Sequence, residues 1–366
     1  MKVSIILGTR PQIIKSAPVY LAFKEAGVEC DVVNTGQHYD YEMNRRFFSE
    51  LELPEPSADL NVGAGIPVEQ VSAIIGGLGR HFAEARPDVA LVPGDTNSAL
   101  AAGVASSKAG VSVAHLEAGC RSGDFGMAEE VNRRVLDHMS QVLLCPTADC
   151  VRNVRSERVP ATSIANVGDT MYDSLLRFKP SLGRLDPASK VGLEEGMYAF
   201  MTLHRAETVD SRATLKAVLT AVQLLDFPVA FSVHPRTRER IRSFGISPGP
   251  NVKLLGPLPY VETLAFVYRS KFVITDSGGL QKEAYWLGKP SLIARNSTEW
   301  GEIVKAGAAF LVGTNPARFR RAFEQAARVE KKRFSRAGSI FGGGNASAKV
   351  AKVVSDYINS TGRGSS

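Results

Sequence analysis

Three acidic residues stand where predicted strands end, and their spacing indicates acid–base chemistry. Glu117 directly follows an apolar run typical of a buried strand, Asp95 follows another such run after Pro93-Gly94, and Glu129 opens a helical pattern. Each has a structural explanation as well, because an aspartate before a helix is often an N-cap and acids in a first turn favour the helix dipole. Parallel strands end at the same edge of a sheet, so we expect the three carboxylates to lie close together. Their repulsion would raise some of their pKa values and provide general acid and base groups.

A second group of residues indicates a binding site for a phosphate. The apolar run 272–275 leads into Ser277-Gly278-Gly279, and a helical pattern that carries Glu283 follows directly. Glycine lets the backbone approach a ligand closely, and the free N–H groups of a helix N-terminus bind anions. A tight turn without a ligand is the alternative explanation. Arg10 and Lys15 lie near the N-terminus of the first predicted helix, which also favours an anion, and Arg295 follows another predicted strand and could add a cation. His204 ends a further predicted strand, where a structural role is the alternative.

Composition and motifs exclude several classes of protein. The net charge of +7, from 44 Lys and Arg against 37 Asp and Glu, favours an anionic partner. The basic runs mix charge signs and lack interleaved aromatic residues, so we expect a small anionic substrate and no nucleic acid. Neither GxGxxG nor GxxxxGK(S/T) occurs, which argues against a dinucleotide site and a P-loop. The four scattered cysteines form no CxxC pair, which argues against a disulfide framework and a zinc site.

The hydropathy pattern argues against a membrane protein. No run of about 18 apolar residues occurs. The N-terminal MKVSIILGTRP is typical of a strand followed by a loop and not of a signal peptide. We therefore expect a cytoplasmic protein with no membrane partner and no metal.

The elements that must position these residues repeat one pattern twice. Short β-branched runs alternate with helical patterns from 3 to 145 and again from 198 to 358. Such alternation predicts right-handed crossovers and parallel sheets with helices on both faces. Because 366 residues exceed what one hydrophobic core usually supports, we predict an α/β protein of two doubly wound, Rossmann-like domains that face a central cleft. The first domain would span 1–165 and the second 166–345.

Many short motifs occur in an order that resembles one enzyme family. They are GTRPQIIK, NTGQH, VPGDTNS, HLEAGCRS, EEVNR, NVGDT, LHRAE, GPLPY and TDSGGLQKEA. In this order they resemble the non-hydrolysing UDP-N-acetylglucosamine 2-epimerases, which have the GT-B fold. The resemblance covers nearly the whole chain and implies a UDP-sugar substrate, no cofactor and a homodimer. It also implies that a final helix at about 346–360 packs back on the first domain.

The resemblance carries the family's functional positions onto single residues of this sequence. It implies catalytic roles for Asp95, Glu117, Glu129 and His204. It implies UDP contacts for a larger set, with Phe266 near the uracil: Arg10, Lys15, Phe266, Ser277, Gly278, Gly279, Glu283 and Arg295. Bacterial members also bind a second UDP-GlcNAc as an activator, and Gln37 and His38 are the candidates for that site. Asp40 stands near where the family has a further glutamine there.

The implied reaction is an epimerisation at C2 of the sugar. A base removes the C2 proton and UDP departs by anti elimination, which leaves 2-acetamidoglucal. UDP then adds back while a proton is delivered to the opposite face of C2.

The sequence departs from the family pattern at two places, and the second departure leaves the exact substrate open. Ala128 stands where the family has the proline of Pro-Glu-Glu, and the segment Thr298-Glu299-Trp300-Gly301-Glu302 replaces TERPE. The Glu-Trp form resembles relatives that act on 2,3-diacetamido uronic acid sugars, so such a sugar is an alternative substrate. A GT-B glycosyltransferase and a nucleotide-sugar sensor without turnover are further alternatives.

Overall fold

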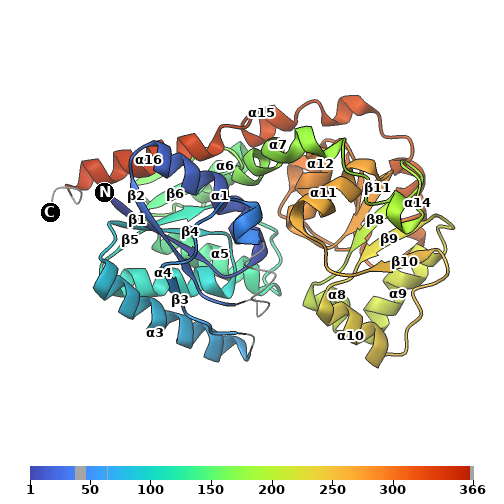
Figure 1. Ribbon diagram of the computed structural model, residues 1–366, viewed down its shortest axis with the longest axis horizontal. Helices are drawn as coiled ribbons and strands as arrows, with labels where there is room; N and C mark the ends of the chain where they lie inside the picture. The colour runs from blue at the N-terminus through green and yellow to red at the C-terminus, as the bar shows by residue number, and fades with distance from the viewer. Residues whose placement is uncertain (38–46, 64, 363–366) are drawn as a thin grey trace. The chain divides into compact units, whose positions relative to one another are not determined.

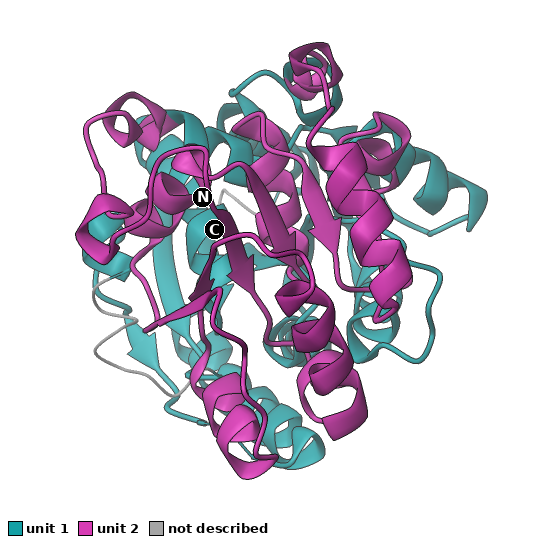
Figure 2. Cartoon of the chain, turned by 90° about the vertical axis from the view of Figure 1, so that its right-hand side faces the viewer, with its two compact units in different colours: residues 1–176, 338–366 teal, residues 177–337 magenta. Residues whose placement is uncertain are grey.

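The computed structural model describes residues 1–37, 47–63 and 65–362, and it divides into two compact units (Figures 1 and 2). Unit 1 comprises residues 1–176 together with 338–366, and unit 2 comprises 177–337. The chain therefore passes from one unit to the other twice, in α7 (Thr170–Leu182) and at the start of α15 (Ala337–Phe341). The predicted domain boundaries at 165 and 345 stay a prediction.

Unit 1 is built on a seven-stranded sheet whose strands are all parallel. Its strand order is β3-β2-β1-β4-β5-β6-β7. The strands are β1 (Lys2–Leu7), β2 (Glu29–Asn34), β3 (Ala58–Asp59), β4 (Val89–Pro93), β5 (Ser112–Leu116), β6 (Val142–Cys145) and β7 (Ser163–Asn166). Every residue of β4, β5 and β6 is buried, as expected for central strands of a parallel sheet with both faces covered.

The helices of unit 1 whose full bounds the structure describes pack around this sheet, and the last two come from the distant C-terminal segment. They are α1 (Arg10–Glu25), α3 (Pro67–Ala85), α4 (Asn97–Ala109), α5 (Ala128–Met139), α6 (Ala148–Ser156), most of α7, α15 and α16 (Ala346–Thr361). Helix α16 packs against α1 (Figure 1). The Tyr357 hydroxyl lies 2.9 Å from Ser112 Oγ at the start of β5.

Unit 2 repeats the architecture with a six-stranded parallel sheet of order β10-β9-β8-β11-β12-β13. The strands are β8 (Ala199–Thr202), β9 (Val229–Ser232), β10 (Val252–Leu255), β11 (Phe272–Thr275), β12 (Ser291–Ile293) and β13 (Ala309–Leu311). The helices are α8 (Ala206–Val209), α9 (Arg212–Gln223), α10 (Pro235–Ser243), α11 (Tyr260–Arg269), α12 (Gly278–Trp286), α13 (Gly301–Lys305) and α14 (Pro316–Ala326). Two parallel, helix-covered sheets confirm the predicted α/β class.

The order of the strands determines where each unit can bind a ligand. In unit 1 the chain order reverses between β1 and β4, and in unit 2 it reverses between β8 and β11. At such a switch point the loops after the two strands diverge and leave a crevice at the carboxyl end of the sheet. The loops that carry Asp95 and His204 begin at these positions.

Candidate active site

Asp95 follows β4 after Gly94 and is held by helix α5. The Arg133 guanidinium donates Nε to Asp95 Oδ2 at 3.0 Å, and its Nη2 pairs with the same oxygen. Asn132 Nδ2 donates to the backbone carbonyl of Asp95 at 2.9 Å. The N-cap of α4 is the neighbouring Thr96, whose hydroxyl accepts from the backbone N–H of Ala99. The Asp95 carboxylate is therefore fixed by an arginine and is not used to cap the helix.

Glu117 follows β5 in an unusual backbone conformation. Its φ is +73°, in the left-handed region that costs about 1–2 kcal/mol for a residue with a Cβ. Its carboxylate pairs with Lys15 of α1, and both side chains are almost wholly buried. Pro93 and Leu116 are register partners in β4 and β5, so Asp95 and Glu117 leave the same edge of the sheet. Backbone strain of this kind persists where surrounding structure fixes it, and it is concentrated at functional sites.

Glu129 and Glu130 open α5 but have different surroundings. Glu130 is fully buried and accepts from the Ser122 N–H at 2.9 Å, the Gly123 N–H at 3.3 Å and Arg133 Nη1 at 2.9 Å. Burial raises the pKa of Glu130, but the Ser122 hydrogen bonds and the arginine charges outweigh it, and the pKa lies below its ordinary value. Glu130 therefore anchors the loop before α5. Glu129 is half-buried and comes from the same first turn, which leaves it as the candidate acid.

A buried histidine–aspartate pair fastens the loops that carry Asp95 and Glu117. His115 Nδ1 lies 2.7 Å from Asp137 Oδ1, and its Nε2 lies 2.9 Å from the Gly94 carbonyl. Asp137 also accepts from Arg121 at 2.7 Å and from the Gly119 N–H at 3.2 Å. Burial raises the pKa of Asp137, but the charges of His115 and Arg121 outweigh it and hold that pKa below its usual range. The Asp137 carboxylate therefore holds Gly94, the residue before Asp95, through His115, and it holds Gly119 in the loop after Glu117 directly.

The other predicted residues of unit 1 lie around the same sheet edge. Arg10, at the start of α1, places its guanidinium carbon 5.1 Å from the centre of the Phe47 ring. Gln37 accepts at Oε1 from the backbone N–H and the hydroxyl of Ser98, at 3.0 and 2.7 Å, in the first turn of α4. The predicted activator residue Gln37 therefore contacts the helix that follows Asp95. His38 lies outside the described residues.

In unit 2 a buried aspartate organises the loop after β8. Asp276 accepts from the backbone N–H of His204 at 3.0 Å and of Arg205 at 3.0 Å, and His204 Nδ1 lies 3.2 Å from its other oxygen. Burial raises the pKa of Asp276, but the His204 charge and these hydrogen bonds outweigh it and lower that pKa. The His204 ring, 42% exposed, is held at the carboxyl end of the sheet and still reaches solvent.

The Ser277-Gly278-Gly279 segment forms the N-terminus of α12 as predicted. Ser277 is the N-cap, and its hydroxyl accepts from the Leu280 N–H. Glu283 lies further along α12 and is 5% exposed. Arg295, which follows β12, donates to Glu299 at 2.9 Å.

Phe266 lies deeper than the other candidates. Its ring is 1% exposed and packs against Phe200 and Tyr198 in the core of unit 2. The Tyr198 hydroxyl donates to the Phe266 carbonyl at 2.6 Å. A contact with uracil stays a prediction, and it would have to come from the backbone of Phe266 because the ring face is covered.

Comparison with known proteins identifies the family. A family model described as UDP-N-acetylglucosamine 2-epimerase matches residues 22–355. The chain belongs to this family. It is 39% identical to a UDP-N-acetylglucosamine 2-epimerase homolog of Methanococcus maripaludis and 37% identical to the UDP-2,3-diacetamido-2,3-dideoxy-D-glucuronate 2-epimerase of Pseudomonas aeruginosa. Each of these matches covers 97% of this chain and 99% of the relative.

The fold agrees with that of solved members of the UDP-N-acetylglucosamine 2-epimerase family. The crystal structure of the Methanocaldococcus jannaschii UDP-GlcNAc 2-epimerase in complex with UDP-GlcNAc and UDP matches with a TM-score of 0.90 at 34% identity. The match covers 97% of this chain and 99% of that chain. The family resemblance indicated by the motifs is confirmed, and the two-sheet architecture is of the GT-B type.

Several residues that organise this epimerase-family site were missed by sequence reasoning. Arg133 and Asp276 lie inside the motifs EEVNR and TDSGG. Arg133 stands four positions after Glu129 on the predicted helix, and this spacing could have indicated an arginine on the same helix face as the acid. The pairing of His115 with Asp137 had no such signal, because the two residues lie 22 positions apart on different elements.

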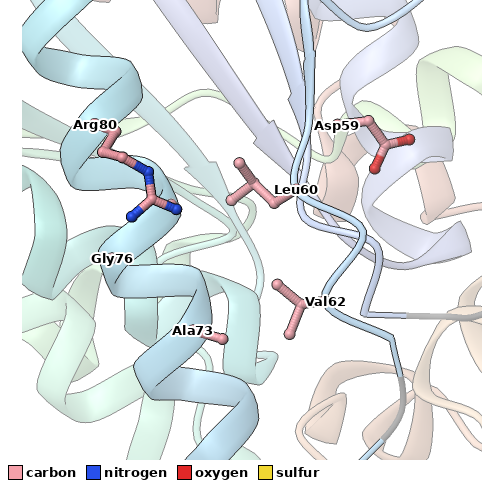
Figure 3. A pocket seen from close by; sticks show the side chains of 7 residues that line it. Asp59, Leu60, Val62, Ala73, Gly76 and Arg80 are labelled. Carbon is pink, nitrogen blue, oxygen red and sulfur yellow. The ribbon is translucent and has the colours of Figure 1, made fainter.

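Other features of the epimerase-family chain lie apart from the candidate residues. Figure 3 shows a hollow between α3 and the segment after β3, and no predicted site residue lines it. Within the described ranges, no group of three or more His, Cys, Asp or Glu side chains could hold a metal ion. No described helix is long and apolar enough to span a membrane.

Proposed function

We propose that this protein is a non-hydrolysing UDP-N-acetylglucosamine 2-epimerase that interconverts UDP-GlcNAc and UDP-ManNAc. The observation that carries the proposal is Glu117, a buried carboxylate in a strained backbone position, paired with Lys15. A strained acid beside a second fixed acid, Asp95, suits proton transfer better than a structural role. The names of the relatives support the same activity. We further propose a cytoplasmic homodimer that supplies a nucleotide sugar for polysaccharide synthesis.

The proposed reaction breaks and re-forms two bonds of the sugar. A carboxylate takes the proton from C2, the C1–O bond to UDP breaks, and a C1–C2 double bond forms. UDP then re-forms the C1–O bond while an acid delivers a proton to the other face of C2. Because the two faces of C2 need two proton-handling groups, we assign these steps to Asp95 with Glu117 or Glu129.

The departing UDP carries negative charge that the protein must stabilise. We assign this task to the segment Ser277-Gly278-Gly279, through the Ser277 hydroxyl and the N–H groups of the two glycines, to Arg295 and, at the phosphate, to His204. Glu283 would accept hydrogen bonds from the ribose hydroxyls. Arg10 and Lys15 would add positive charge. Gln37 and His38 stay our candidates for an activator site.

Incubation with UDP-GlcNAc in D2O tests the proposal. NMR should show deuterium at C2 together with the appearance of UDP-ManNAc. Release of free ManNAc would indicate a hydrolysing enzyme, and UDP binding without deuterium exchange would indicate a sensor. Either result would contradict the proposal.

Amide variants test the assigned acids. Asp95→Asn and Glu117→Gln should each abolish exchange at C2 and leave the affinity for UDP largely intact. Asp149→Asn is the matched control, because Asp149 forms a partly exposed ion pair with Arg152 on α6 and should keep full activity. Full activity of Asp95→Asn or Glu117→Gln would refute the assignment.

A second substrate is favoured by one sequence feature. Trp300 stands where UDP-GlcNAc epimerases typically have the arginine of TERPE, and a relative of comparable identity is named a 2,3-diacetamido glucuronate 2-epimerase. Exchange with the UDP-2,3-diacetamido uronic acid sugar, and none with UDP-GlcNAc, would assign the protein to that substrate.

A further inference from the structure

A glutamate side chain lies over the N-terminus of α12, where an anion is expected to bind. A Cβ built on Gly278 would lie 2.2 Å from Glu299 Oε1, so only a glycine at this position admits the carboxylate. The first turn of α12 contains no acidic residue of its own. Glu299 thus brings negative charge to the N–H groups that we assign to the pyrophosphate of UDP.

The same carboxylate pairs with arginines that flank this position. Arg295 Nη1 donates to Glu299 Oε2 at 2.9 Å, and the two side chains are 3% and 7% exposed. Arg205 Nη2 lies 3.8 Å from the other oxygen, Oε1. Glu299 therefore contacts both parts of the proposed anion site, the helix N-terminus and the arginine assigned to UDP.

The residues on either side of Glu299 are fastened to α12 itself. The Thr298 hydroxyl donates to Gln281 Oε1 at 2.7 Å and accepts from the Trp300 N–H at 3.2 Å. Lys282 Nζ lies 4.0 Å from the centre of the Trp300 ring. Because both neighbours are fixed, Glu299 can leave the helix N-terminus most directly by rotation about its own side-chain bonds.

We propose that Glu299 is a displaceable carboxylate that occupies the pyrophosphate position until the nucleotide binds. The inference rests on the proposed binding of UDP to Ser277, Gly278 and Gly279. The Glu299 carboxylate and a pyrophosphate bound at Gly278 cannot share this space, and their like charges repel at this distance. Glu299 keeps Arg295 paired and oriented in the empty protein. On binding, the pyrophosphate replaces Glu299 at α12 and at Arg295, so part of the interaction energy offsets the loss of the internal ion pair.

Calorimetric titration with UDP tests the proposal on Glu299→Gln. The uncharged amide competes less well for the N–H groups and Arg295, so we expect UDP to bind about tenfold more tightly than to the wild type. The KM for the UDP-sugar should fall in parallel. Glu324→Gln is the matched control, because Glu324 forms an exposed pair with Arg320 on α14, and its UDP affinity should stay at the wild-type value.

Thermal unfolding and a second variant add independent readouts. Glu299→Gln removes the carboxylate charge that pairs with Arg295 Nη1, so the unliganded variant should melt at a lower temperature, and UDP should raise that temperature more than in the wild type. Glu299→Asp keeps the charge but is one methylene shorter, so it should give intermediate tightening.

The possible outcomes separate this inference from the proposed function. Suppose that the wild type binds UDP and exchanges the C2 proton for deuterium. If a folded Glu299→Gln then binds UDP equally or more weakly than the wild type, only the role of Glu299 is overturned. Equal tightening by Glu324→Gln would show a general effect of charge and would overturn it too. Wild type that neither binds UDP nor exchanges C2 would overturn both.

Discussion

Replacement of Gly119 by alanine tests whether the backbone after β5 holds Glu117 in place. Gly119 has a φ of +78°, and an alanine there costs about 1–2 kcal/mol for the left-handed conformation alone. The new Cβ would also lie 2.3 Å from the Cys150 carbonyl oxygen and 3.1 Å from Val154. Relief of this overlap requires a shift of the Glu117 loop or of α6, at a cost of about 1–3 kcal/mol. We therefore expect Gly119→Ala to lose roughly 2–5 kcal/mol of folding free energy.

The matched control is Gly123→Ala in the same loop. Gly123 has a φ of +74°, but a Cβ there meets no atom within 4 Å, so only the conformational cost of about 1–2 kcal/mol applies. Urea unfolding measures both losses, and C2 exchange in D2O measures the activity. Gly119→Ala should reduce exchange by about a hundredfold, since a displacement of about 1 Å at a catalytic group has that effect. Equal stability and equal activity of the two variants would refute the reasoning.

Two further predictions concern the charged groups around the acids. Arg133→Lys keeps the charge but cannot reproduce the three donors that Arg133 directs at Asp95 and Glu130. We therefore expect kcat to fall about tenfold to a hundredfold with KM nearly unchanged. An unchanged kcat would contradict this prediction. Asp276→Asn should be less stable than wild type at pH 7, and the difference should shrink as pH falls below about 4. A carboxyl whose pKa is lowered on folding stabilises the protein above its unfolded pKa and loses that contribution as pH falls through the folded value. Urea unfolding between pH 7 and pH 3 measures this, and a constant difference would contradict it.

The fold could be predicted where strands are wholly buried. The run that became β4 is apolar throughout, and the run that became β5 is apolar except for Ser112 and His115. Both faces of the sheet are covered there, and such a pattern is typical of a parallel strand. β3 has two residues and β13 has three, which is too short for any periodicity. β7 reads Ser-Ile-Ala-Asn, is only partly buried, and lies at the sheet edge, so its composition does not differ from that of a loop.

The candidate site could be predicted in its residue types but not in its geometry. The spacing suggested Asp95 as an N-cap or as an acid, and only the structure showed that Thr96 caps α4. Glu129 and Glu130 are adjacent acids, and their different burial depends on where the loop before α5 lies. The strained backbone of Glu117 had no signal, because a glutamate has no preference for positive φ.

Helix α16 belongs to unit 1 but lies at the C-terminal end of the chain, and this affects the order in which the two units can fold during translation. Its buried side chains Val350, Val354 and Ile358 cover unit 1, yet the ribosome makes them only after all of unit 2. Until then the apolar surface that they cover, next to Ser112, stays open to water. The unit that holds the three acids is therefore the later of the two to be completed, and its nascent form exposes apolar surface that favours aggregation until α16 is made.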